Sequence, residues 1–197
     1  MIRKTFKIFV LFWVASIGFA QIDETKVIDV NPAIPSEPVK EGVCWDQSVV
    51  LPRFGAWSCV TANKENYDPC FSQENVTDAV VCDVNPVKNS LGLKLKLAQP
   101  LPFSQGMAAL PDQAWIVELE NHIICKVEAG PQKIIANTGT IAFVCDEPGL
   151  SAGVNAGLLS GFELGTVWQG HLVHYSVENE NYVANTITQV SIKTVWR

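Results

Sequence analysis

Two long segments near the end of the chain decide the fold: TVWQGHLVHYSV (residues 166–177) and VANTITQVSIKTVW (residues 183–196). Both are dense in Val, Ile, Thr and aromatic residues, the types that favour β-strands. A polar stretch, ENEN (residues 178–181), joins them and is typical of a turn. The pair therefore predicts a β-hairpin.

The same texture continues upstream. Residues 91–97 alternate Leu with Gly or Lys, the period-2 pattern of a half-buried strand. Two further hairpins are predicted around Glu120-Asn121 and around Asn137-Thr138-Gly139. We find no convincing 3.6-residue periodicity after residue 20. The sequence predicts an all-β fold: a single disulfide-stapled, sandwich or barrel-like domain over residues 43–197.

Residues 1–20 have the pattern of a secretory signal peptide. A basic start precedes an uncharged apolar run at residues 8–20, and small residues (Gly18 and Ala20) stand three and one positions before Gln21. The run is too short for a transmembrane helix, which needs about 20 apolar residues. We predict cleavage after Ala20 and export to the periplasm, the cell surface or the medium.

Residues 21–42 contain three prolines and several charges without a steady period. This composition predicts an extended, mobile N-terminal arm ahead of the domain.

The charge balance argues against two classes of partner. The whole chain has 14 basic and 20 acidic residues, and removing Arg3, Lys4 and Lys7 with the signal peptide leaves 11 against 20, a net charge of −9. Nucleic-acid binding and adhesion to anionic lipid both need clustered Lys and Arg. We also expect no membrane span in the mature chain, because no later segment is long and apolar enough.

Six cysteines follow the signal peptide, and an even number in an exported chain predicts disulfides. They are Cys44, Cys59, Cys70, Cys82, Cys125 and Cys145. No Cys-x-x-Cys pair and no Cys with a nearby His points to a metal site, so we predict no metal and no cofactor. The positions of the predicted strands make nearest-neighbour pairing the simplest proposal: Cys44–Cys59, Cys70–Cys82 and Cys125–Cys145. The other connectivities stay open.

Several short elements resemble a family of uncharacterised exported bacterial proteins. These elements are Cys44-Trp45-Asp46-Gln47-Ser48, Ala56-Trp57-Ser58-Cys59, Asp68-Pro69-Cys70-Phe71, Val80-Val81-Cys82, Ala114-Trp115 with Cys125, Cys145, and Thr194-Val195-Trp196. The resemblance would cover most of residues 43–197, and it implies export and a cysteine-stapled domain without an established activity. Ser58 departs from the basic residue expected before the Cys.

No catalytic residues can be assigned from the sequence. A Gly-x-Ser-x-Gly elbow is absent, and residues 157–161 have the wrong spacing for one. His171 and His174 are three apart and would point to opposite faces of a strand. Acids suited to glycoside hydrolysis are numerous, and nothing selects a pair among them. The candidates are Asp68, Asp83, Glu118, Asp146 and Glu163.

Five tryptophans follow the signal peptide: Trp45, Trp57, Trp115, Trp168 and Trp196. We expect most in the core, with Trp45 and Trp57 packed on disulfides. At least one of Trp168 and Trp196 is expected to be partly exposed as a partner-binding anchor.

The leading hypothesis is a non-enzymatic exported binding module for an unknown protein or glycan. The alternatives are a carboxylate-dependent hydrolase of a cell-wall or host polymer, and a structural envelope component.

Overall fold

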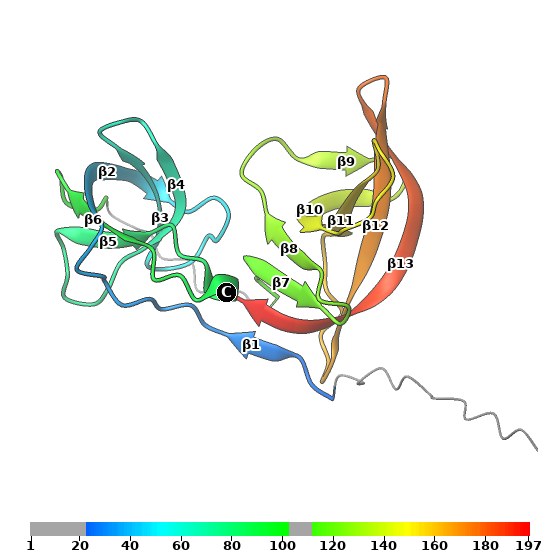
Figure 1. The fold of residues 1–197 in the computed structure, drawn as a ribbon, viewed down its shortest axis with the longest axis horizontal. Helices are drawn as coiled ribbons and strands as arrows, with labels where there is room; N and C mark the ends of the chain where they lie inside the picture. Colours follow the sequence, from blue (N-terminus) through cyan, green and yellow to red (C-terminus); the bar gives the residue numbers. More distant parts are fainter. Residues whose placement is uncertain (1–22, 103–111) are drawn as a thin grey trace, which may run out of the picture.

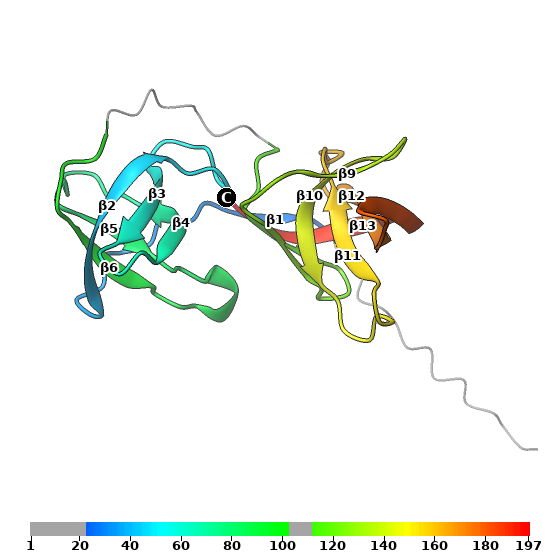
Figure 2. The same ribbon diagram turned by 90° about the horizontal axis from the view of Figure 1, so that it is seen from above.

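The computed structural model describes residues 23–102 and 112–197, and it confirms the all-β prediction. The strands divide between two sheets that lie side by side (Figures 1 and 2). The predicted signal peptide lies outside the described residues.

The first sheet is a closed five-stranded barrel. It consists of β2 (Val39–Gln47), β3 (Ala56–Thr61), β4 (Asn66–Phe71), β5 (Ala79–Cys82) and β6 (Leu93–Leu97), with a short 3₁₀ helix, η1 (Pro86–Lys88), between β5 and β6. Neighbouring strands pair antiparallel, and β2 closes the barrel by pairing parallel with β6. The predicted alternation in β6 is confirmed, because Leu93 and Leu95 are buried while Lys96 is exposed.

The second sheet has eight strands. They are β1 (Lys26–Ile28), β7 (Ile116–Leu119), β8 (Ile124–Val127), β9 (Lys133–Ile135), β10 (Gly139–Asp146), β11 (Asn155–Leu159), β12 (Trp168–Glu178) and β13 (Asn181–Trp196). The path β13-β12-β11-β10-β8-β7 returns to β13 through a β7–β13 pairing, so six strands form a second ring. A buried apolar cluster, which includes Leu158, Leu172 and Ile192, lies among these strands.

All three predicted hairpins are present as β7–β8, β9–β10 and β12–β13. In the β12–β13 hairpin, Asn179 and Glu180 take positive φ angles of 49° and 68°. Two such residues make a turn whose twist matches that of the flanking strands.

The nearest-neighbour disulfides are confirmed: Cys44–Cys59, Cys70–Cys82 and Cys125–Cys145. Each joins cysteines on adjacent strands. No cysteine in the described part of the chain is free. Three disulfides are typical of an oxidising, non-cytoplasmic compartment.

Two parts of the predicted mobile N-terminal arm are built into the sheets. Strand β1 pairs parallel with the last residues of β13, and β2 begins at Val39, within the predicted arm. Thr25 is buried, and its hydroxyl donates to Ile192 O at 2.6 Å and accepts from Trp168 N at 2.7 Å. A strand of three residues has no local signature, because its partner is at the other end of the chain.

An apolar junction joins the two sheets. It contains Val30, Val50, Leu51, Ala56, Phe71, Trp115, Ile116 and Trp196, which come from both sheets and from the segments between their strands. The Phe71 and Trp115 rings pack across it with centroids 5.7 Å apart. The C-terminus lies at the same junction (Figures 1 and 2). The barrel is therefore an insertion between β1 and β7 that packs back onto the second sheet.

Candidate functional site

The two tryptophans predicted as exposed anchors are both buried, so that prediction is wrong. Trp168 and Trp196 are each only 8% exposed. Trp168 lies in the core of the second sheet and Trp196 in the junction. Each indole packs among the other buried apolar side chains of its cluster, which cover it from solvent.

Among the tryptophans of the described residues, Trp45 is the exposed one, with 53% of its surface accessible. The pairing of β2 with β3 slips between Cys44 and Asp46, so Trp45 is the extra residue of a β-bulge. A bulge re-aims side chains at that position. Trp57, by contrast, packs in the barrel core with the cysteines, as expected.

The histidines lie apart from one another in separate polar contacts. His122 Nδ1 lies 2.7 Å from Glu118 Oε1 on the β7–β8 hairpin. His174 on β12 bridges Thr186 Oγ1 and Glu147 Oε2 at 2.9 and 2.7 Å. His171, also on β12, lines a different hollow.

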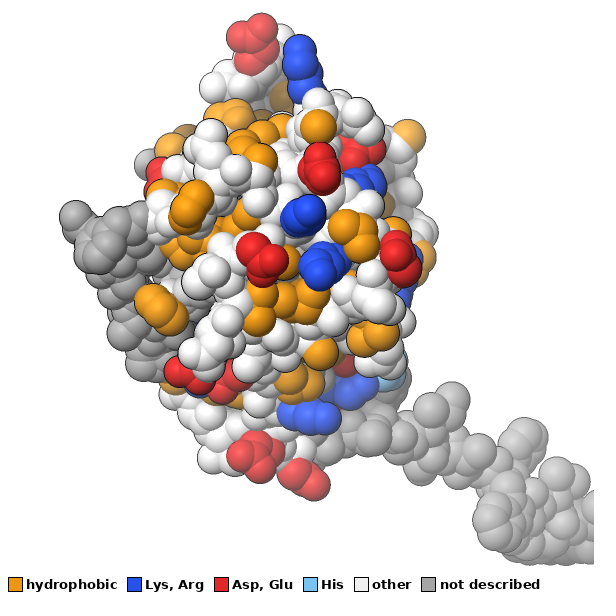
Figure 3. All heavy atoms as spheres, turned by 90° about the vertical axis from the view of Figure 1, so that its left-hand side faces the viewer, with side chains coloured by type: hydrophobic (Ala, Val, Ile, Leu, Met, Phe, Trp, Pro, Cys, Tyr) orange, Lys and Arg blue, Asp and Glu red, His pale blue; other side chains and the backbone are white. Residues whose placement is uncertain are grey.

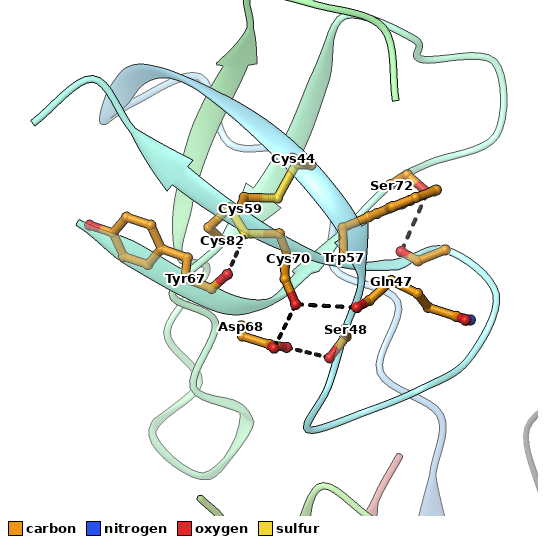
Figure 4. Close-up of a disulfide and its surroundings, with 12 residues drawn as sticks. Cys44, Gln47, Ser48, Trp57, Cys59, Tyr67, Asp68, Cys70, Ser72 and Cys82 are labelled. Atoms are coloured by element: carbon orange, nitrogen blue, oxygen red, sulfur yellow. Dashed lines mark hydrogen bonds between the residues drawn. A yellow bond between two sulfur atoms is a disulfide. The ribbon is translucent and has the colours of Figure 1, made fainter. Parts of the chain in front are cut away.

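Two of the candidate acids are engaged in holding the structure. Glu118 receives hydrogen bonds from Lys193 Nζ at 2.8 Å and Thr194 Oγ1 at 3.3 Å. Partial burial raises the pKa of this carboxyl, but the hydrogen bonds from Lys193 and His122 outweigh it, and the net pKa is lowered. Asp68 accepts from Ser58 Oγ at 2.7 Å, from Val49 N at 3.0 Å and from the Ser48 hydroxyl (Figure 4).

The Asp68 contacts fix the loop between β2 and β3. Ser48, which donates to Asp68, also accepts from Leu51 N at 2.9 Å. One carboxylate thus holds the first half of residues 48–55 against β4. This loop carries two of the most exposed apolar side chains of the described residues, Val49 at 71% and Phe54 at 72%.

Phe54 lies at a cavity of about 600 Å³, which we call the Phe54 cavity. Three separate segments line it: Asp29 and Asn31 before the barrel, residues 53–55 of the β2–β3 loop, and residues 71–75 after β4. Of these, Phe54 is the exposed apolar side chain, whereas amide, carboxylate and guanidinium groups supply most of the rest.

Arg53 anchors the wall of the Phe54 cavity. Its guanidinium lies 5.4 Å from the centre of the Phe71 ring and donates to the carbonyl oxygen of Val30. Burial lowers the pKa of Arg53, with Asp29 opposing that effect. Arg53 Nε is buried without a hydrogen-bond partner in the described structure. The guanidinium is therefore held by stacking and one carbonyl, with hydrogen-bonding capacity left over.

The other walls of the cavity are tied down as well. Gln73 Nε2 donates to Pro32 O at 2.8 Å, and Ser72 N donates to Gly55 O at 2.9 Å. Asp29 pairs with Arg197 Nε at 2.8 Å, which links the cavity to the C-terminus. A preformed, polar cavity with one aromatic at its rim can bind a ligand without paying for loop ordering.

Sequence reasoning missed this site. Pro52 and Gly55 give residues 52–55 the composition of an ordinary turn, and Asp29 and Asn31 fall within the predicted mobile arm. The one usable signal was Phe54, a large apolar residue inside a Pro- and Gly-containing turn, where core packing is unusual.

One group of metal-type ligands lies close together in the described residues: the Sγ atoms of Cys59, Cys70 and Cys82, all within 4.8 Å of one another. All three are in disulfides, so none is a thiolate that could bind a metal as the protein stands.

The face of the barrel in Figure 3 mixes apolar side chains with both signs of charge. Within the described ranges, no helix has the length and hydrophobicity needed to cross a membrane.

No protein-family model, no curated protein and no solved structure matches the chain. The resemblance to cysteine-rich exported proteins therefore stays a prediction.

Proposed function

We propose that this protein is an exported, non-enzymatic binding module whose ligand enters the Phe54 cavity. The observation that carries the proposal is the exposure of Phe54, 72%, at a cavity of about 600 Å³ whose other lining residues are mostly of polar type. Ligand cavities are typically about 300–1,000 Å³ and combine an apolar surface with a few placed polar groups.

Rigidity supports the binding role. The β2–β3 loop is held by Asp68 at one end and stacks through Arg53 on Phe71 at the other. Disulfides Cys44–Cys59 and Cys70–Cys82 fasten the strands that flank it. An exposed aromatic on a rigid loop loses little conformational entropy on binding, which is how interface hot spots reach high affinity.

The chemistry of the cavity favours a glycan over a protein segment. Asn31, Gln73 and Asn75 offer amides that both donate and accept, which suits neighbouring sugar hydroxyls. Asp29 and Glu74 add acceptors, and an exposed ring such as Phe54 can stack on the apolar face of a sugar.

The test is co-sedimentation of the purified mature protein with insoluble peptidoglycan, chitin and cellulose. We expect Phe54→Ala to weaken binding to the recognised polymer by about tenfold or more, the loss typical of a hot spot. Leu91→Ala is the matched control, because Leu91 is also an exposed apolar residue of the barrel, 69% accessible, and does not line the cavity. It should leave binding unchanged.

Two results would contradict the proposal. Equal losses in both variants would show that binding does not depend on the Phe54 cavity. Release of soluble sugars from a polymer, abolished by one Asp or Glu substitution, would replace the binding module with a hydrolase.

A further inference from the structure

Two of the three disulfides lie next to each other inside the barrel. Cys59 Sγ is within 4.8 Å of both Cys70 Sγ and Cys82 Sγ, although Cys59 is bonded to Cys44 (Figure 4). The cause is the order of strands: β3 carries Cys59 and pairs with β4, which carries Cys70 and pairs with β5, which ends at Cys82. Their side chains meet in the same barrel core.

This proximity matters because disulfides exchange by attack of a thiolate on a disulfide sulfur. A thiolate released at Cys59 would need to move by less than the 4.8 Å separation to reach either sulfur of the neighbouring bond. The packed core also holds all three sulfurs at high effective concentration.

We propose that Cys44, Cys59, Cys70 and Cys82 form a single thiol–disulfide exchange centre that a thiol of another molecule enters through Cys44. In the first step, the external thiolate attacks Cys44 Sγ, a mixed disulfide forms, and Cys59 leaves as a thiolate. In the second, Cys59 attacks Cys70 or Cys82, a new disulfide forms, and the other cysteine becomes the thiolate. Each step forms one S–S bond and breaks one, so no further oxidant or reductant is consumed.

Burial makes Cys44 the entry point. Cys59, Cys70 and Cys82 are each 0% exposed, whereas Cys44 is only partly buried. Cys44 also directly precedes Trp45, which the bulge in β2 leaves exposed. The co-reactant is a small thiol such as glutathione, or the cysteine of a partner protein.

The third disulfide supplies an internal control. Cys125–Cys145 lies in the core of the second sheet, and no other cysteine belongs to that cluster. A thiolate released there has no second disulfide within reach.

The deciding experiment locates the free thiol in Cys44→Ser. The folded variant is held at about pH 8.5, near the ordinary thiol pKa, and then acid-quenched, alkylated and peptide-mapped. We expect the label to be shared among Cys59 and at least one of Cys70 and Cys82, with the matching non-native disulfide to Cys59. In the control, Cys125→Ser, the label should stay on Cys145. Label confined to Cys59 in Cys44→Ser would overturn the proposal.

A second measurement covers the case in which Cys44→Ser fails to fold. The intact wild-type protein is incubated with glutathione under native conditions, quenched and mapped. We expect glutathione on Cys44 together with a Cys59–Cys70 or Cys59–Cys82 bond. Glutathione on Cys44 with a free thiol only at Cys59, or no adduct at Cys44 at all, would contradict the exchange centre. Either outcome leaves glycan binding at the Phe54 cavity to be judged separately.

Discussion

At the scale of single residues, the hydrogen bonds that each acidic side chain accepts indicate its role. Asp68 is one of several acids that the sequence leaves equivalent, and its carboxylate accepts three hydrogen bonds. Glu118 is similar, with Lys193, Thr194 and His122 around it. Both carboxylates are thus engaged with donors of neighbouring strands and loops, which gives each a role in holding the structure.

The structural role of Asp68 can be tested with Asp68→Asn. Val49 N and the Ser58 hydroxyl donate to one carboxylate oxygen, and the Ser48 hydroxyl donates to the other. The amide NH2 of Asn must replace one of these acceptors, so at least one donor loses its partner. We expect a loss of about 1–3 kcal/mol in the free energy of unfolding, measured by urea denaturation. Asp46→Asn is the control, because exposed Asp46 bonds only the neighbouring Gln47 N, and its effect should stay within about 0.5 kcal/mol. Equal effects in the two variants would contradict the role given to Asp68.

At the scale of elements, the ends of the long strand β13 hold the second sheet together. Its last residues, Thr194, Val195 and Trp196, pair with β1 on one edge and with β7 on the other. Glu118 on β7 reinforces the second pairing through Lys193 and Thr194 of β13. The ionised carboxylate of Glu118 therefore adds to the backbone pairing that closes the six-strand ring.

This dependence predicts a pH effect for Glu118→Gln. The pKa of Glu118 is lowered in the folded protein from its ordinary value of 4.5, so its stabilising contribution is fully present above about pH 4.5. The contribution is lost as the pH falls through the folded pKa. Urea midpoints should show Glu118→Gln less stable than the wild type at pH 7, with the difference shrinking toward pH 3.

Glu120→Gln provides the comparison, because Glu120 is exposed on the adjacent turn and its bond to β13 is made by the backbone, from Glu120 N to Ser191 O. That variant should differ little from the wild type at either pH. A Glu118→Gln deficit that persists unchanged at pH 3 would rule out the carboxylate as its cause.

At the scale of the whole molecule, the apolar junction packs the two sheets against each other. Phe71 of the barrel, Trp115 beside β7 and Trp196 of β13 share one apolar cluster. The Phe54 cavity lies beside it, since Arg53 stacks on Phe71 and Asp29 pairs with Arg197. The shape of the cavity therefore depends on the packing of the two sheets.

Trp115→Ala should expose this dependence. Removing a buried Trp, 8% exposed, costs about 3–5 kcal/mol, and here the cost falls on the junction. We expect unfolding to change from one transition to two. Far-UV circular dichroism reports the loss of the strands, and Trp fluorescence reports the loss of the cores. Trp45→Ala, at an exposed site, should keep a single transition. A single transition in Trp115→Ala would mean that the two sheets do not depend on the junction.

The sequence by itself determined the local features of this protein. The all-β class and the three hairpins follow from residues close together in the chain, because strand alternation and turn chemistry act over a few to about twenty residues. The cysteine positions favoured the nearest-neighbour disulfides, and the structure selected them from the open connectivities. The tertiary structure alone decided the pairing of β1 with β13 and the burial of Trp168 and Trp196. It also decided the exposure of Phe54 and the cavity that unites Asp29 with residues 53–55 and 71–75. These features join segments far apart in the chain, and a local pattern specifies which face of a strand is apolar without specifying what will cover it.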